Sequence, residues 1–358
     1  MTIRAVNKNT TPLCVMPDGK FVCYRQGYII VLEEGNGYKK FLSFHSKKEK
    51  LLGCFNLVCR LLRLGVRAAE AFDDITVVLS IGSMLYELNI NTGELSKGYH
   101  CGEGIRPLIF TTVKGINDIV DGVYFGGYLN NRPKKPVDVY QRTGIDQWKV
   151  VYTFPQGSIN HIHNIVSDPY RQCLWVFTGD FDESSAIWRV TDNFQKVERV
   201  VCNDQKYRGC VAYALPEGLL YATDAPFADN FIYLMHPETY ETKPLFPLHG
   251  SCIYGCQWKD NYVFSSTVEG DGRNTSKLEF LFGRKRGAGI KDDFVHMYKG
   301  NPTVGFQEIY KEKKDSLPFL FQFGVFKFPY GKNNTDTLYF QPVATKKNDL
   351  KLMAYKEL

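Results

Sequence analysis

The ten cysteines of this sequence include no CxxC pair and follow no regular spacing. A zinc module needs four ligands at short, paired intervals, and only Cys252 and Cys256 come near such spacing. Other cysteines lie in apolar runs, such as Cys173 in CLWVF, where a free thiol packs as a small hydrophobic side chain. We therefore expect structural cysteines and no zinc module.

Long apolar runs are also missing. No stretch approaches the roughly 18 apolar residues of a membrane-spanning helix, and the N-terminal MTIRAVNKNTTPLCVMPDGK has no apolar core of a signal peptide. Together with the free cysteines, these absences predict a protein of the reducing cytoplasm without a membrane span. The net charge is +6, but its basic residues are scattered, and stretches such as GRKRG at 283–287 are typical of solvated turns. We expect no nucleic-acid partner.

Sustained helical periodicity is almost absent, and only residues 47–70 could hold a helical turn or two. Aromatic residues, in contrast, make up 14% of the chain and favour half-buried strands. Short alternating runs separated by turn residues recur from end to end. The clearest unit, residues 158–201, contains the strands NHIHNIVSD, CLWVFTG, SAIWRVTD and KVERVV.

Seven such units can be placed, with a period of about fifty residues that suits four-stranded antiparallel blades. They span 11–44, 54–101, 105–154, 158–201, 208–246, 251–300 and 305–358. The last unit has three clear strands, and TIRAV at the N-terminus could supply its outer strand and join the chain ends. The sequence therefore predicts an all-β fold, a single β-propeller over residues 1–358, with seven blades, or six if the first two units form one.

Two strand-turn-strand segments carry a further pattern. Residues 139–154 (VYQRTGIDQWKVVYTF) and 187–201 (IWRVTDNFQKVERVV) resemble degenerate Asp-box hairpins, in which a strand ends in Ser/Thr-x-Asp, turns at Gly or Asn, and resumes at Trp. The turn at Asp192 and the aromatic Trp148 each keep part of the box, whose Asp side chain caps backbone N–H groups of the turn. Asp boxes are characteristic of sialidase-like and other carbohydrate-handling propellers, so the resemblance implies a saccharide ligand. The sequence has no Phe-Arg-Ile-Pro segment near its N-terminus, and the resemblance does not extend to sialidase activity.

Candidate site residues follow from propeller geometry. The start of each inner strand and the loop between the second and third strands open on the same face, so these positions converge from different blades. The predicted inner-strand starts are Arg106, His161, His163, Arg208, Tyr254, Gln307 and Glu308. The loops contribute Asp180, Asp182, Glu183, Asp224, Asp229, Glu269, Asp271 and Arg273. An ordinary blade edge needs no such mixture of acids, histidines and arginines, and we expect a ligand site here.

His161 and His163 are two residues apart on a predicted strand, so their side chains point the same way. Two imidazoles on one face can share a divalent metal or divide proton transfer with a carboxylate. Hydrogen bonds to neighbouring carbonyl groups are the structural alternative. In arrangement this unit looks like the propeller polysaccharide lyases of the oligogalacturonate type, which use channel histidines around a metal. That resemblance implies a divalent metal cofactor.

These residues predict a carbohydrate-active enzyme, a glycoside hydrolase or polysaccharide lyase, that acts on an acidic sugar or glycan. The two histidines would be the base or the metal ligands, and Asp180 or Glu308 the acid. Arginines suit a carboxylate or phosphate, with inter-blade salt bridges as the structural alternative. The expected substrate contacts are Arg106, Arg208, Asp182, Asp224, Tyr254 and Gln307.

Two other functions fit the same sequence. One is a non-catalytic propeller that binds glycan or protein, although the chain has no WD dipeptide typical of WD-repeat scaffolds. The other is a metal-dependent, lactonase-like hydrolase, whose calcium ion would need carboxylate and amide oxygens in the channel. Candidates for those oxygens are Asn160, Asn164, Asp224 and Glu308.

Overall fold

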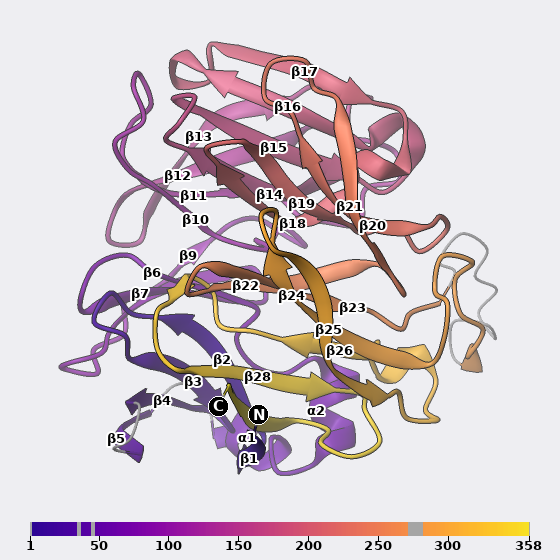
Figure 1. Cartoon of the computed structure of the whole chain (residues 1–358). Coiled ribbons are helices and arrows are strands. Elements are labelled where there is room, and N and C mark those ends of the chain that lie inside the picture. Colours follow the sequence, from indigo (N-terminus) through magenta and orange to yellow (C-terminus); the bar gives the residue numbers. More distant parts are fainter. Residues whose placement is uncertain (1, 34–36, 44–46, 271–281, 358) are drawn as a thin grey trace.

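The computed structural model describes residues 2–33, 37–43, 47–270 and 282–357. Seven β-sheets of four antiparallel strands form the blades of a β-propeller, which confirms the predicted fold class and the larger number of blades (Figure 1). Within each blade the chain runs from the innermost strand outwards. The four strands of one blade are thus consecutive in sequence, except in the last blade.

The first four blades contain sixteen strands. Blade 1 consists of β2 (Thr10–Val15), β3 (Phe21–Arg25), β4 (Tyr28–Glu33) and β5 (Gly37–Ser43). Blade 2 consists of β6 (Ala68–Ala71), β7 (Thr76–Ile81), β8 (Met84–Asn89) and β9 (Tyr99–His100). Blade 3 consists of β10 (Thr111–Val113), β11 (Gly122–Gly126), β12 (Val137–Gly144) and β13 (Gln147–Phe154). Blade 4 consists of β14 (His161–Asp168), β15 (Cys173–Gly179), β16 (Ala186–Thr191) and β17 (Lys196–Cys202).

The last three blades complete the ring. Blade 5 consists of β18 (Gly209–Leu215), β19 (Gly218–Thr223), β20 (Asn230–Met235) and β21 (Thr242–Leu248). Blade 6 consists of β22 (Cys252–Trp258), β23 (Asn261–Ser266), β24 (Phe294–Asn301) and β25 (Gly305–Lys313), and β27 (Lys332–Asn333) adds to it in parallel beside β22. Blade 7 consists of β26 (Val325–Lys327), β28 (Thr337–Val343), β29 (Lys351–Lys356) and the N-terminal β1 (Thr2–Lys8).

The N-terminal strand closes the ring as the sequence predicts. β1 pairs with β29 in antiparallel fashion, from Thr2 opposite Lys356 to Lys8 opposite Lys351. The two chain ends therefore lie close together (Figure 1). The closure supplies the last blade with its outer strand, so the outer edge of β29 is paired and not open.

The predicted boundary between the last two units is wrong. Residues 305–313 form β25, the outermost strand of blade 6, and blade 7 begins only at β26. The connection between β23 and β24 is long, so the run FVHMYKG is the third strand of blade 6 and its fourth strand still follows. The run KLEFLFG at 277–283, which the sequence also predicts to be a strand of this unit, falls almost entirely outside the described residues.

The second strand is buried over its whole length in three of the seven blades. Every residue of β15, β19 and β28 is buried, because neighbouring sheets cover both faces of these strands. This explains why CLWVFTG reads as a continuous apolar run without alternation. The packed blades form the scaffold from which loops carry the site.

Two short helices connect blades 1 and 2, where the sequence allows a helical turn or two: α1 (Lys47–Leu52) and α2 (Asn56–Leu62). Arg60 of α2 is 2% exposed and pairs with Asp315 at 2.5 Å and with Asp349 at 3.3 Å. The connection is thereby attached to loops of blades 6 and 7. Within the described residues there are also four 3₁₀ turns: η1 (Asp182–Ser184), η2 (Asp192–Phe194), η3 (Gln205–Tyr207) and η4 (Phe319–Phe321). No helix in the described part of the chain is long and apolar enough to cross a membrane.

The two Asp-box-like hairpins are β12–β13 and β16–β17. Trp148 packs as the resemblance implies, buried against Phe110 and Phe125. The turn at Asp192 differs, since the backbone N–H of Gln195 donates to the backbone oxygen of Asp192, and no hydrogen bond from the turn to the Asp192 carboxylate is present in this described segment. Trp148 is therefore buried as the resemblance implies, whereas the side-chain cap that the resemblance implies at Asp192 is not found in the described segment.

Candidate functional site

The two histidines lie at the start of the inner strand of blade 4. His161 is the first residue of β14, and the pairing of β14 with β15 shifts by one residue at His163. Such a bulge redirects a side chain. The inner strand of blade 5 has the same shift at Cys210, so His163 and Cys210 occupy equivalent places in adjacent blades.

The charged residues come from the ends of neighbouring strands. Asp180 directly follows β15 and Asp224 directly follows β19, while Arg208 directly precedes β18. Close packing requires glycine at position 179, directly before Asp180. A Cβ there would lie 2.6 Å from His163 Cε1 and 3.1 Å from Arg208 Cγ. Only glycine allows the histidine and the arginine to approach this strand end so closely.

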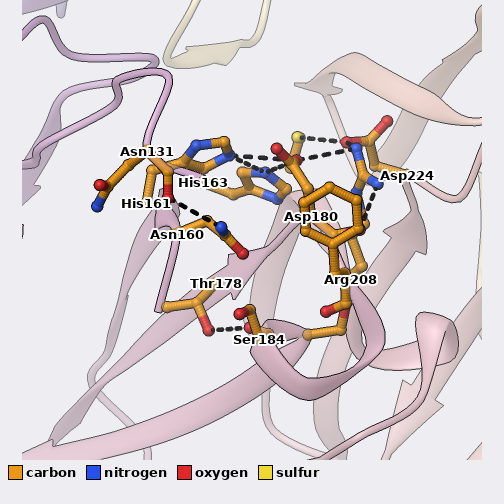
Figure 2. Close-up of polar contacts among 12 residues, drawn as sticks. Asn131, Asn160, His161, His163, Thr178, Asp180, Ser184, Arg208 and Asp224 are labelled. Atoms are coloured by element: carbon orange, nitrogen blue, oxygen red, sulfur yellow. Dashed lines mark hydrogen bonds and ion pairs between the residues drawn. The ribbon is translucent and has the colours of Figure 1, made fainter. Parts of the chain in front are cut away.

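Three side-chain atoms converge at one point (Figure 2). His161 Nε2 lies 2.9 Å from His163 Nε2, and Asp180 Oδ1 lies 3.2 Å from the first and 3.4 Å from the second. His161 Nδ1 lies 2.9 Å from the backbone oxygen of Leu129. Because a carbonyl oxygen only accepts, Nδ1 carries the proton and Nε2 of His161 presents a lone pair to the cluster. The rings are 3% and 2% exposed, so this arrangement is set by the protein interior.

Arg208 is held between two carboxylates, as Figure 2 shows. Its Nη2 lies 3.1 Å from Asp180 Oδ1 and 3.2 Å from Asp224 Oδ2, and its Nη1 donates to the backbone oxygen of Asp180 at 2.8 Å. The Cys210 thiol donates to Asp224 Oδ2 at 3.4 Å. The inter-blade salt bridge considered as the structural alternative for Arg208 is therefore present, and the terminal nitrogens of Arg208 are already engaged.

The protonation states follow from this network. Burial opposes ionisation of Asp180, but its contacts with both histidines and the charge of Arg208 hold its pKa well below the usual range. Burial lowers the pKa of His163, which therefore stays neutral at neutral pH, although Asp180 partly offsets this effect. Burial and the negative charge of Asp224 raise the pKa of Glu269 to about 8. The centre thus combines an ionised carboxylate with a neutral imidazole.

The donor set fits a divalent cation. Donor atoms bound to one ion at about 2.1 Å lie roughly 3.0 to 3.4 Å apart at octahedral and tetrahedral angles, and the three separations here are 2.9, 3.2 and 3.4 Å. A metal-bound histidine commonly donates its other N–H to a backbone carbonyl, as His161 does to Leu129. Two imidazoles and a carboxylate suit first-row transition metals.

Other predicted residues lie beside this centre. Asp182 is exposed on η1, where its carboxylate accepts a hydrogen bond from Gln205 Nε2 at 2.8 Å. Arg106 and Tyr254 line a neighbouring cleft. Glu183, at the blade edge, pairs with Lys134, and Asp271 and Arg273 fall outside the described residues.

Gln307 and Glu308 are not part of the centre. The expectation that they begin an inner strand is wrong, since both lie on β25, the outermost strand of blade 6. There Glu308 pairs with His296, whose other ring nitrogen contacts Asp292. Both residues were misplaced by the shifted boundary between blades 6 and 7.

Sequence reasoning missed Tyr128 and Cys210. The ring of Tyr128 lies against that of His161, with centroids 4.2 Å apart. Tyr128 follows β11 in the loop between the second and third strands of blade 3, the same loop position from which blade 4 contributes Asp180. The expectation that loops between second and third strands reach the site would have identified Tyr128 if it had been applied to blade 3. Cys210 has no signal in the sequence beyond its place two residues after Arg208.

No family model matches this chain, and neither does any curated protein sequence. Similar solved structures include an oligogalacturonate lyase in complex with manganese, at 12% identity and a TM-score of 0.62, covering 100% of this chain and 96% of that one. The Cps50 (Swd1) β-propeller domain of Myceliophteria thermophila has 8% identity and a TM-score of 0.58, with coverage of 100% and 99%. The AfRom2 CNH domain has 8% identity and a TM-score of 0.56, with the same coverage. At such identities these similarities establish the propeller fold alone.

Proposed function

We propose that this chain is a carbohydrate-active enzyme that acts on an acidic sugar at the mouth of the propeller channel, with a divalent metal ion held by His161, His163 and Asp180. The observation that supports this most directly is the convergence of two imidazole nitrogens and one ionised carboxylate oxygen within 3.4 Å of one another. The solved lyase with manganese shares the fold and makes such chemistry on a propeller plausible as a precedent.

Each surrounding residue has a positioning role in this proposal. A bound divalent ion would supply positive charge that stabilises negative charge developing on a carboxylate or carbonyl oxygen. The Leu129 carbonyl fixes the ring of His161, and Arg208 holds the Asp180 carboxylate in place and ionised. Asp224 in turn balances the charge of Arg208.

Elimination is better supported than hydrolysis in which Asp180 or Glu308, the two acids expected from the sequence, protonates the leaving group. Such hydrolysis needs one protonated carboxylic acid beside the scissile bond, and the low pKa of Asp180 keeps it ionised. Glu308, the other expected acid, lies on an outer strand. A lyase instead needs a cation to neutralise the enolate that forms when the proton next to a carboxylate is removed. The same placement of Glu308 removes one oxygen ligand from the lactonase-like alternative.

The experiment is a turnover assay with metal-supplemented protein on acidic oligosaccharides and their neutral counterparts. Mass spectrometry of the products distinguishes the reactions, because hydrolysis adds a water and elimination does not. We expect elimination products from an acidic oligosaccharide, and their loss in His163→Ala. The matched control is His236→Ala, which removes an exposed turn histidine outside the centre.

Equal turnover in His163→Ala and in the unaltered chain would contradict the proposal. Binding of acidic sugars without any product would favour the non-catalytic glycan-binding propeller instead. Products formed by the addition of water would replace elimination with hydrolysis.

A further inference from the structure

A second concave site adjoins the centre. The connection that follows α2 forms one wall of a cleft of about 380 Å³, and the starts of blades 3, 6 and 7 form the others. Four basic side chains contribute to its lining: Arg63, Arg67, Arg106 and Lys327. No acidic residue lines the cleft within the described part of the chain.

The charges of these four cations are not balanced by acidic residues of the described part of the chain. In the described ranges, no carboxylate forms an ion pair with any of them. The Nε atoms of Arg67 and Arg106 are buried and have no hydrogen-bond partner in the described structure. Burial and the neighbouring charges of Arg67 and Arg63 lower the pKa of Arg106, as expected for like charges held together. Such a cluster destabilises the fold unless an anion occupies it, and a cleft lined by one sign of charge concentrates ligands of the other sign.

Tyr128 connects the cleft to the metal-ligand centre. The Arg67 guanidinium lies over the Tyr128 ring, 5.1 Å from its centroid, and the centroid of the His161 ring lies 4.2 Å from that of Tyr128. The backbone N–H of Tyr128 donates to the backbone oxygen of Arg106 at 2.9 Å. A ligand in the cleft would therefore lie beside the two histidines, separated from them by one aromatic ring.

We propose that this basic cleft binds the anionic groups of the substrate, and that the substrate carries at least two negative charges on consecutive units. The inference rests on the proposed function, because it places the rest of the same substrate next to the reacting sugar. Arg208, the arginine nearest the histidines, is already engaged by Asp180 and Asp224. The arginines of the cleft, in contrast, have donors to spare for carboxylate, sulfate or phosphate oxygens.

The test measures ligand binding to the His163→Ala protein by calorimetry. This variant is used so that turnover does not contribute to the measured heat. The probes are an oligouronate trisaccharide, its methyl-esterified neutral form and inorganic pyrophosphate. We expect the trisaccharide to bind, its neutral form to bind at least about tenfold more weakly, and Arg106→Gln to weaken trisaccharide binding by a similar factor. Arg63→Gln is the second variant, because Arg63 is exposed and its substitution is compatible with folding. The matched control is Lys149→Gln, an exposed cation on the outer strand of blade 3 that lies outside the cleft.

Pyrophosphate binding that depends equally on Arg106 would support the cleft and identify phosphate groups rather than carboxylates as its ligand. Binding of either anion that is the same in Arg106→Gln, Arg63→Gln and Lys149→Gln would overturn the cleft proposal, even if the enzyme turned over. Loss of binding in the arginine variants, together with a chain that forms no product, would support the cleft and leave only the proposed reaction in error.

Discussion

Asp180 stays ionised because of its contacts with two imidazole rings and a guanidinium group. Its oxygen faces two imidazoles and one guanidinium, so the energetic penalty of burial is offset. Its position also depends on Gly179, which admits His163 and Arg208 at distances that a Cβ would prevent. A carboxylate held in this way is suited to binding a cation and unsuited to donating a proton.

Much of the centre could be predicted at the scale of residues. His161, His163, Asp180, Arg208 and Asp224 all sit at strand starts or in loops that propeller topology brings to one face. The pairing of Arg208 with both carboxylates depends on side-chain distances between blades, which sequence spacing does not encode. For this reason Arg208 was expected to contact substrate, whereas its guanidinium is held by Asp180 and Asp224.

The ionisation of Glu70, a single residue, predicts how the stability of the protein depends on pH. Its carboxyl group lines a second cavity, of about 260 Å³, in the channel, and accepts a hydrogen bond from Thr112 at 3.0 Å. Burial raises its pKa from the ordinary 4.5 to about 7. The folded state therefore keeps a proton that the unfolded state loses, so this residue lowers stability progressively as pH rises from about 4.5 to 7.

We expect Glu70→Gln to unfold at a higher urea concentration than the unaltered chain at about pH 8, and at a similar concentration at about pH 5. The gain at the higher pH should be at most about 3 kcal/mol, because half-burial leaves the carboxyl partly solvated. An equal difference at both pH values would show that ionisation of Glu70 is not responsible.

At the scale of elements, α2 determines one wall of the basic cleft although it lies outside every blade. Arg60 fixes the helix through Asp315 and Asp349, and its Nε donates to the backbone oxygen of Phe321 at 2.7 Å. A helical turn could be predicted here from sequence. Its attachment to blades 6 and 7 could not, because these partners lie more than 250 residues further along the chain.

Arg60→Ala should destabilise the protein by about 3 kcal/mol, because the partly buried Asp349 loses its cation and Asp315 keeps only Lys314. Hydrogen exchange should increase through the described connection from 47 to 67, while the blades keep their protection. The matched control is Arg63→Ala at the end of the same helix, where the exposed side chain has no acidic partner among the described residues. If both variants unfolded alike, the ion pairs of Arg60 would not be what holds the helix.

The strand assignment failed where one connection is unusually long. The segment between β23 and β24 spans 267–293, so the fourth strand of blade 6 falls where a regular repeat would begin blade 7. In the run GFQEIYKEK apolar and polar residues alternate as in other edge strands, so the sequence does not indicate which strand of a blade it forms. This error moved Gln307 and Glu308 from the rim to the predicted centre.

At the scale of the whole molecule, the repeat was the most informative feature of the sequence. Seven units and a spare N-terminal strand were sufficient to predict the ring and its closure through β1. The fold brings loops of blades 3, 4 and 5 together, and so places an aromatic ring, two histidines and two carboxylates beside one another. The same fold occurs in a lyase and in domains such as Cps50, so the fold cannot identify the chemistry.

The most direct test of the proposed centre is calorimetric titration of chelator-treated protein with Mn²⁺ and with Zn²⁺, beside Asp180→Asn and the double variant His161→Ala/His163→Ala. The account predicts one ion per chain in the unaltered protein and in His236→Ala, at least about tenfold weaker binding in Asp180→Asn, and none in the double variant. Absence of binding in the unaltered protein, or binding that persists without both histidines, would contradict it.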